Sequence, residues 1–478
     1  MSVQNLSLNN LKLGSHIHLM GICGTAMASL AGILIEQGFK VTGSDSNPYP
    51  PMSTQLENLG VKIQKPYSAE NLMPRPDFVI VGNVISANNP EAIELNKLKI
   101  PFSSLPQAMG EFIIADRDSY VVSGTHGKTT TTSMLSWVCE QVGLQPGFLI
   151  GGIPKNFSQS FRSPKANTFV IEGDEYDTAY FDKVPKFIHY RPKNVILTSV
   201  EFDHADIYKD FQAVKDAFIT LMKLIPESGQ LIYWGDDQNV VEVSSHCKIK
   251  NKFSYGFTES VDFKCLITEE NEGLTRFKVI HEGQPVGEFV TTMTGKYNLL
   301  NATSVVAMSF LKQFDFAKTQ KAISTFAGVK RRQEIIGEPN NILIIEDFAH
   351  HPTAVKQTIE AIQNRYKSRK VFSIFEPRSA TSRRKVFQKD YFDAFSKAQE
   401  TVLSEAFNSS ALDEDNRFSS AELIADLVKI DKKATLFAGA DAIVAYLKLQ
   451  AKPNDVILIM SNGGFDGIYQ KLISALEK

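Results

Sequence analysis

The chain has 478 residues, more than one hydrophobic core usually fills, so we expect about two to four domains. Its 51 Lys and Arg residues nearly balance its 53 Asp and Glu residues, which excludes an overall basic field for a nucleic-acid backbone or an anionic membrane and favours a small-molecule substrate. Hydrophobic residues at 43% and charged residues at 22% exclude a disordered or fibrous chain.

The opening segment, residues 1–10, lacks the basic and apolar regions of a secretory signal, and no stretch approaches the roughly 18 apolar residues of a membrane span. The cysteines lie far apart and form no C-x-x-C pair, which argues against a zinc knuckle and against a disulfide framework. We therefore expect a cytoplasmic protein.

The first α/β unit begins with an apolar strand at 16–20, followed by a helix at about 25–37 and a strand at 39–42. The turn between them resembles a dinucleotide fingerprint only in part, because Cys23 stands where the second glycine belongs. Asp45, about 20 residues onward, is placed to hold a ribose hydroxyl. A nucleotide-shaped ligand is favoured over simple close packing of the turn, and NAD is not required.

The second unit places a glycine-rich loop, residues 124–130, between a strand at 120–123 and a helix at about 128–142. Glycines turn backbone N–H groups toward an anion, Lys128 neutralises phosphate oxygens, and Thr129 offers a hydroxyl to Mg²⁺. Val122 occupies the place of the first glycine of the strict pattern, so this is a shortened form. Phosphate binding is favoured over a glycine turn that only caps a helix.

Carboxylates follow the next strands of this unit. The strand at 169–171 leads into four acids within residues 172–177, beginning with Glu172, and the strand at 195–197 leads toward His204. The carboxyl ends of parallel strands meet at one edge of a sheet, and clustered carboxylates there favour a hard cation such as Mg²⁺. The alternative to metal binding is a solvated loop for the acids and a hydrogen-bonded loop histidine for His204.

Residues 231–294 are richer in alternating and β-branched residues and predict an antiparallel or mixed extension. After it, Asn298 and Asn301 lie on one helical face, which suits a purine edge or a helix cap equally.

The third unit follows Arg331 and Arg332, which suit a phosphate contact or a solvated charge pair. It has a strand at 342–345, a helix that begins near Pro352 and a closing strand at 456–459. We predict domains at 1–107, 108–330 and 331–478.

Together these segments resemble the Mur ligases of bacterial cell-wall synthesis over nearly the whole chain. The resemblance lies in residues 18–27, 43–45, 124–132, 172–177, 201–204, 295–301 and 347–353. It implies an α/β fold in three domains: a Rossmann-like N-terminal domain, a central P-loop ATPase-like domain and a C-terminal Rossmann-like domain.

Within the family, residues 175–183 with the added segment 187–190, residues 375–379 and residues 461–465 are similar to the branch that ligates a murein tripeptide during peptidoglycan recycling. The branch that adds L-alanine during new synthesis remains the alternative. Two positions depart from the family pattern: Gly173 replaces the usual alanine, and Phe348 with Ala349 replaces the usual Tyr-Gly pair.

The resemblance implies a set of roles for residues of this chain. ATP would be bound by Gly124, Thr125, His126, Gly127, Lys128, Thr129, Thr130, Asn298, Asn301 and Arg331. Two Mg²⁺ ions would be held by Thr129, Glu172 and His204, and the catalytic residues would be Lys128, His204, Arg332 and His350. Substrate would contact Gly21, Cys23, Gly24, Thr25, Asp45, Arg378 and Asn462.

The implied partners are UDP-N-acetylmuramate and the murein tripeptide, with no nucleic acid and no membrane, and the implied state is a monomer or a weak dimer. Two other classes of function remain open, an NAD-dependent oxidoreductase and a nucleotide-gated switch. The substitution at Cys23 and the second phosphate loop argue against the first. A nucleotide-gated switch needs no acceptor site, so ATP turnover that depends strictly on a UDP-muramate acceptor would exclude the second.

Overall fold

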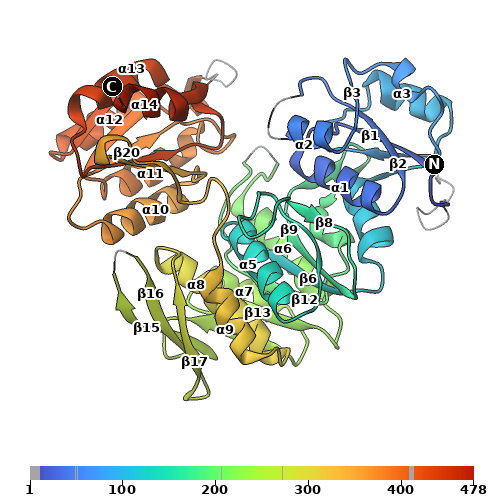
Figure 1. The fold of residues 1–478 in the computed structure, drawn as a ribbon, viewed down its shortest axis with the longest axis horizontal. Coiled ribbons are helices and arrows are strands. Elements are labelled where there is room, and N and C mark those ends of the chain that lie inside the picture. The colour runs from blue at the N-terminus through green and yellow to red at the C-terminus, as the bar shows by residue number, and fades with distance from the viewer. Residues whose placement is uncertain are drawn as a thin grey trace.

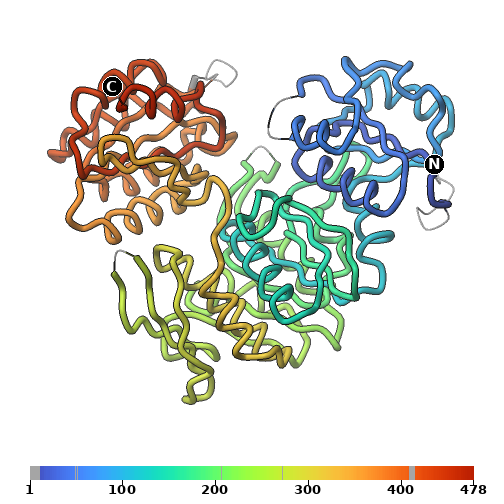
Figure 2. The backbone as a smooth tube through the Cα atoms, viewed as in Figure 1, coloured from blue at the N-terminus to red at the C-terminus, as the bar shows by residue number. Residues whose placement is uncertain are grey.

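The computed structural model describes residues 11–48, 50, 52–205, 207–271, 273–407 and 414–477. Three β-sheets, each flanked by helices, follow one another along the chain. In Figures 1 and 2 the first lies at upper right, the third at upper left, and the central part below and between them. The expectation about residues 1–10 falls outside the described residues, and no helix within them is long and apolar enough to cross a membrane.

The first sheet has five parallel strands in the order β3-β2-β1-β4-β5, the order of the first five strands of a dinucleotide-binding fold. Its central strands β1 and β4 are almost wholly buried, and β4 is a continuous apolar run, as strands covered on both faces are. The strands are β1 (His16–Met20), β2 (Lys40–Ser44), β3 (Ile63–Gln64), β4 (Phe78–Val81) and β5 (Phe102–Ser104), and the α-helices are α1 (Thr25–Glu36), α2 (Met52–Asn58), α3 (Pro90–Lys97) and α4 (Leu105–Ala108).

The central sheet has ten strands in the order β17-β16-β15-β14-β13-β12-β6-β9-β7-β8. Its α/β part contains β6 (Asp118–Ser123), β7 (Gly147–Leu149), β8 (Phe161–Arg162), β9 (Thr168–Gly173), β12 (Asn194–Leu197), β13 (Gln230–Trp234) and β14 (Lys252–Gly256). The helices are α5 (Lys128–Gln141), α6 (Phe211–Leu224), α7 (Gln238–Ser245), α8 (Lys296–Leu311) and α9 (Phe316–Thr325), and a separate hairpin pairs β10 (Asp177–Ala179) with β11 (Asp182–Pro185).

The predicted extension of this sheet is confirmed as mixed. Strands β13 and β14 continue the parallel part, whereas β15 (Phe263–Glu270), β16 (Thr275–His281) and β17 (Gln284–Thr291) pair with one another in antiparallel register. These three strands project at the lower left of Figure 1.

The third sheet has six strands in the order β18-β19-β23-β20-β21-β22, and β18 alone of the six is antiparallel to its neighbour. The strands are β18 (Glu334–Gly337), β19 (Leu343–Asp347), β20 (Val371–Phe375), β21 (Glu400–Ser404), β22 (Lys433–Phe437) and β23 (Val456–Met460). The helices are α10 (Pro352–Arg365), α11 (Gln388–Phe395), α12 (Ser420–Lys429), α13 (Ala440–Gln450) and α14 (Ile468–Leu476).

The first and central parts touch at a point where only glycine fits. A Cβ on Gly32 of α1 would lie 2.0 Å from Cζ of Phe161, a buried residue of β8. Nearby, the hydroxyls of Ser29 and Ser160 are hydrogen-bonded at 2.9 Å. The absent side chain therefore lets the helix lie directly on the ring.

The four cysteines are all buried and unbridged. Burial is the first cause that raises the pKa of each thiol, to about 12 for Cys23 and to about 11 for Cys265. A raised thiol pKa disfavours the reactive thiolate. The absence of disulfides agrees with the spacing of these residues in the sequence.

Candidate active site

The loop that follows β6 presents the open end of α5. Gly127, the N-cap of α5, has φ of 81°, and no described side chain caps the helix, so its first N–H groups can bind an anion. Gly124 has φ of 133°, and a Cβ there would lie 2.3 Å from the Thr198 hydroxyl. Both glycines are thus required by the backbone of the loop.

Lys128 extends along this loop. Its ammonium donates to the carbonyl of Gly124 at 2.6 Å and to the carboxylate of Glu175 at 2.8 Å. Burial alone would lower the pKa of Lys128, but the negative charges of Glu175 and Asp174 outweigh it and raise that pKa. The loop therefore holds a fixed positive charge where a phosphate chain would lie.

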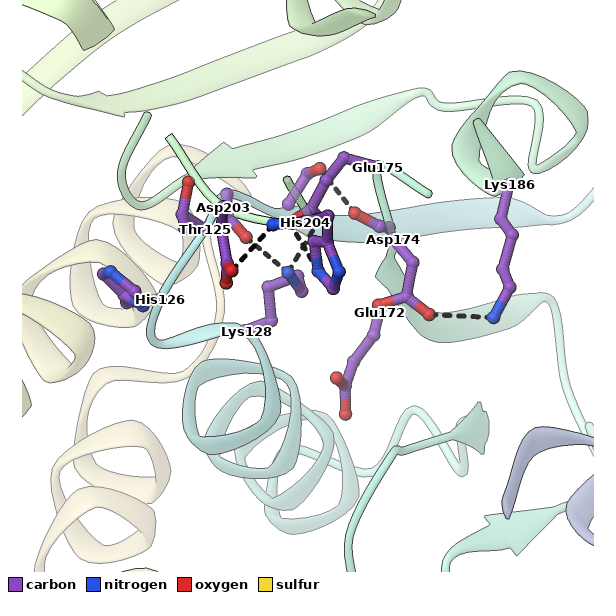
Figure 3. A network of polar contacts seen from close by, with 12 residues as sticks. Thr125, His126, Lys128, Glu172, Asp174, Glu175, Lys186, Asp203 and His204 are labelled. Atoms are coloured by element: carbon purple, nitrogen blue, oxygen red, sulfur yellow. Dashed lines mark hydrogen bonds and ion pairs between the residues drawn. The ribbon is translucent and has the colours of Figure 1, made fainter. Parts of the chain in front are cut away.

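Glu172, the penultimate residue of β9, lies beside the same helix. One carboxylate oxygen accepts from the Thr129 hydroxyl at 3.0 Å, and the other accepts from the N–H of Gly151 at 2.5 Å. Burial, with added repulsion from Asp174, raises the pKa of Glu172 to about 7. Figure 3 shows Asp174 turned toward Lys186, which lies 3.2 Å away. Two carboxylates share this buried place, so a cation would relieve their repulsion.

His204, in the segment after β12, lies beside the acids that follow β9. It has φ of 52°, and its Nε2 lies 3.6 Å from Glu175 Oε1. The preceding residue, Asp203, accepts from the His204 N–H at 2.7 Å and fixes this turn. The segments that follow β9 and β12 therefore meet at one edge of the sheet, as the sequence predicts.

A cavity of about 330 Å³ collects residues from all three parts of the chain. Asn298 and Asn301 line it from the first turns of α8, where the Asn298 side chain also donates to the carbonyl of Thr294 at 2.7 Å. The predicted site residues that line it are Thr25, Thr125, His126, Gly127, Lys128, Thr129, Thr130, Glu172, His204, Asn298, Asn301, Arg332 and His350.

Other predicted site residues lie outside this cavity. Arg331 donates to Glu346 at 2.5 Å and to the carbonyls of Ser461 and Gly463, which ties the start of the third domain to its closing strand. Arg332, by contrast, lines the cavity and lies over the ring of Phe348 at 4.8 Å. The predicted residues that do not line the cavity are Gly21, Cys23, Gly24, Asp45, Gly124, Arg331, Arg378 and Asn462.

The turn between β1 and α1 is held by Asp45, the acid that follows β2. The N–H of Cys23 donates to Asp45 Oδ2 at 2.9 Å, and Gly21 has φ of 78°. Asp45 thus holds the loop that the sequence assigns to the substrate.

Arg378 and Asn462 lie together in the third part. The Arg378 guanidinium stacks over Phe407 at 3.8 Å from the ring centroid and lies 3.4 Å from Glu376. A Cβ on Gly463 would meet the Arg378 side chain at 2.2 Å. The side-chain oxygen of Asn462 is buried and has no hydrogen-bond partner among the described residues.

Several residues of the site were not predicted individually. Glu175 was one acid among four, and only the folded chain shows that it pairs with Lys128. Glu201 also meets two residues of the third part. His351 Nδ1 lies 3.7 Å from Glu201 Oε2, and Thr353 Oγ1 donates to the same oxygen at 2.6 Å across a separation of 152 residues. A pairing at that distance in sequence leaves no local signal.

Three family models match successive parts of the chain. The Mur ligase family, catalytic domain, matches residues 16–117; the Mur ligase middle domain matches 122–309; and the Mur ligase, glutamate ligase domain, matches 331–463. The matches follow the three sheets in order.

Curated and solved relatives extend over the full length. The chain is 37% identical over 463 residues to the UDP-N-acetylmuramate–L-alanyl-gamma-D-glutamyl-meso-2,6-diaminoheptandioate ligase of Escherichia coli (strain K12), covering 97% of this chain and 98% of the relative. It is 31% identical to the UDP-N-acetylmuramate–L-alanine ligase of Clostridium tetani, covering 96% and 98%. The crystal structure of a murein peptide ligase from Psychrobacter arcticus matches with 34% identity and a TM-score of 0.71, covering 97% and 99%. The chain belongs to the Mur ligase family, whose members are ATP-dependent ligases that form amide bonds.

Proposed function

We infer that this ligase joins L-alanyl-γ-D-glutamyl-meso-diaminopimelate to the carboxylate of UDP-N-acetylmuramate at the expense of ATP. The observation that carries the inference is the cavity that brings Lys128, the acids after β9 and Arg332 together. The choice of peptide over alanine is supported by the higher identity to the peptide ligases, 37% against 31%.

A carboxylate resists attack by an amine because it is negatively charged and would have to expel oxide. Transfer of the ATP γ-phosphoryl group to the muramyl carboxylate gives an acyl phosphate, and the peptide amine then displaces phosphate. Lys128 neutralises charge on the transferring group, while Arg332 and His350 approach from the third domain. Asn298 and Asn301 would contact adenine.

The donor set fits Mg²⁺. Thr129 and Glu172 are hydrogen-bonded hard oxygen donors beside the phosphate loop, and the pKa of Glu172, raised to about 7 by burial and by Asp174, is what an uncompensated carboxylate pair produces. Thr129 and Glu172 would hold one ion and His204 a second. Bound Mg²⁺ would supply charge neutralisation and orientation of phosphate and carboxylate oxygens.

The three domains, 1–107, 108–330 and 331–478, would then divide the work into UDP-muramate binding, ATP binding, and peptide binding with closure. Because an acyl phosphate hydrolyses, closure of the third domain over the cavity should exclude water. Arg378 and Asn462 lie in that domain as candidates for the peptide carboxylates.

The test is the mass of the product after incubation with ATP, Mg²⁺, UDP-N-acetylmuramate and either tripeptide or free L-alanine. A product heavier than the acceptor by the tripeptide less one water is expected. Preferential formation of the alanyl product would support the alanine-adding reaction instead. ATP consumption without an acceptor would favour a nucleotide switch.

A further inference from the structure

A second group of ligand-type side chains lies on the other side of the phosphate loop. It consists of His126 in the loop, Glu201 after β12 and His351 at the N-terminus of α10, and one donor atom of each lies within 4.8 Å of the others. Figure 3 shows His126 set apart from Glu172, Asp174 and Lys186. The group is therefore separate from the acids assigned to Mg²⁺.

The donor atoms converge at the spacing of a transition-metal site. His126 Nε2 lies 3.4 Å from Glu201 Oε2, and His351 Nδ1 lies 3.7 Å from the same oxygen. Two ligands of a tetrahedral zinc ion with bonds of about 2.0–2.1 Å are roughly 3.3 Å apart. The two imidazole rings are tilted by 46° with centroids 4.7 Å apart, so a modest side-chain rotation would bring both nitrogens to one ion.

The histidine that is more deeply buried is held in a tautomer suited to metal binding. His351 Nε2 lies 3.1 Å from the carbonyl of Phe202, which can only accept, so Nε2 carries the proton and Nδ1 keeps its lone pair. Nδ1 accepts the N-cap hydrogen bond of α10 from the N–H of Thr353 at 3.3 Å, and a metal ion bound at Nδ1 would replace this bond. Burial, followed by the charge of His126, lowers the pKa of His351 to about 4 and keeps the ring neutral.

His126 and Glu201, the other two residues of the group, are also placed to bind a metal ion. His126 Nε2 is buried without a hydrogen-bond partner among the described residues. Glu201 is oriented by Thr353 at 2.6 Å, the kind of outer contact that positions a metal-binding carboxylate.

We propose that His126, Glu201 and His351 form a binding site for a divalent transition metal such as Zn²⁺ or Co²⁺, which bridges the phosphate loop and the third domain. Two imidazoles and one carboxylate favour these ions over Mg²⁺. Because the ligands come from both sides of the domain boundary, a bound ion holds α10 against the loop. Two of its ligands, His126 and His351, also line the cavity that contains Lys128, so the site adjoins the one assigned to ATP and its test needs a readout other than activity.

The test uses Co²⁺ alone as the probe, added to the full chain in a large excess of Mg²⁺ and without nucleotide. One ion per chain is expected, with a visible absorption band and a raised thermal midpoint. His126→Ala and His351→Ala should each weaken Co²⁺ binding at least about tenfold. Glu172→Gln, in the acidic group, and His246→Ala, on the exposed end of α7, should bind as the parent does.

His126→Cys guards against variants that fail to fold, since it keeps a metal ligand. It should retain Co²⁺ and add a thiolate-to-cobalt band in the near ultraviolet that the buried native thiols do not give. The proposal is overturned if the parent binds no Co²⁺, if both alanine variants bind it as tightly as the parent, or if the cysteine variant binds Co²⁺ without a thiolate band.

Discussion

The ammonium of Lys128 lies 2.8 Å from the carboxylate of Glu175, so the phosphate-loop lysine is already paired with an acid from the neighbouring strand edge. Both side chains are nearly buried, with 12% and 2% of their surface exposed. A phosphate group bound at this loop would therefore compete with Glu175 for the Lys128 ammonium, which Glu175 holds in place in this structure.

Lys128→Ala should abolish ligation and leave UDP-N-acetylmuramate binding almost unchanged, because we propose that the first domain supplies that binding site. The loss should be roughly 3 kcal/mol or more of transition-state stabilisation, at least about a hundredfold in rate. Single-turnover rates and calorimetric binding of UDP-N-acetylmuramate measure the two effects. Near-parental turnover would remove Lys128 from the mechanism.

Glu172→Gln and His204→Ala should each raise the Mg²⁺ concentration needed for half-maximal activity, since each removes a donor from the acidic group. Glu259→Gln is the matched control, because its carboxylate is 86% exposed and lies in the connection between β14 and β15. Magnesium titrations that overlay for all four proteins would refute the metal assignment.

The parent enzyme should prefer tripeptide over L-alanine by at least roughly tenfold in kcat/KM, or about 1.4 kcal/mol. Arg378→Ala should narrow this ratio, because a guanidinium binds peptide carboxylates that alanine lacks. Arg191→Ala, an exposed arginine of the central part, should leave the ratio unchanged. Competition kinetics with both nucleophiles give the ratio directly, and an unaltered ratio in Arg378→Ala would exclude that residue.

Glu91 makes a pH-dependent contribution to stability. Burial would raise its pKa, but the nearby His18 and the hydrogen bonds from Ser44 and Asn71 lower it below the usual value. The folded pKa thus lies below the unfolded one, so this stability is complete above the unfolded pKa and is lost as pH falls through the folded pKa.

Glu91→Gln should therefore flatten the acid limb of the stability curve relative to the parent. Urea unfolding at a series of pH values from neutral to acidic gives the comparison. Parallel curves for the two proteins would show that Glu91 does not titrate on unfolding.

Gly32→Ala should lower the thermal midpoint, because its methyl group would overlap the Phe161 ring. Overpacking of this kind costs about 1–3 kcal/mol. Gly439→Ala is the control, since a Cβ there has nothing within 4 Å and its φ of 175° suits any residue. Adding Phe161→Leu to Gly32→Ala should recover part of the loss, and a midpoint equal to the parent's for Gly32→Ala would contradict the packing argument.

Several helices of this fold could be predicted from local sequence patterns. The helix predicted at 25–37 is α1 (Thr25–Glu36), that predicted at 128–142 is α5 (Lys128–Gln141), and α10 begins at Pro352. The first two helices follow an apolar strand and a glycine turn, and the third begins at a proline, so each has a local start signal. Strand ends followed by acids predict a shared sheet edge. The domain boundaries and the roles of the site residues remain predictions.

Other features depend on contacts that no short segment encodes. The pairing of Glu201 with Thr353 and the approach of Gly32 to Phe161 join residues that are remote in sequence. Arg331 and Arg332 are adjacent and identical in type, yet one is bound by Glu346 while the other lines the cavity. Backbone direction at this turn, where Arg331 has φ of 62°, separates them.

The burial of Cys23, Cys139, Cys247 and Cys265 makes the chain ready for site-selective labelling. Thiol reagents should find little native background, so cysteines introduced at exposed Asn58 of α2 and Lys448 of α13 can carry a donor and an acceptor dye without prior removal of native thiols. Energy transfer between the dyes would then report the distance between the outer domains in solution as ligands are added.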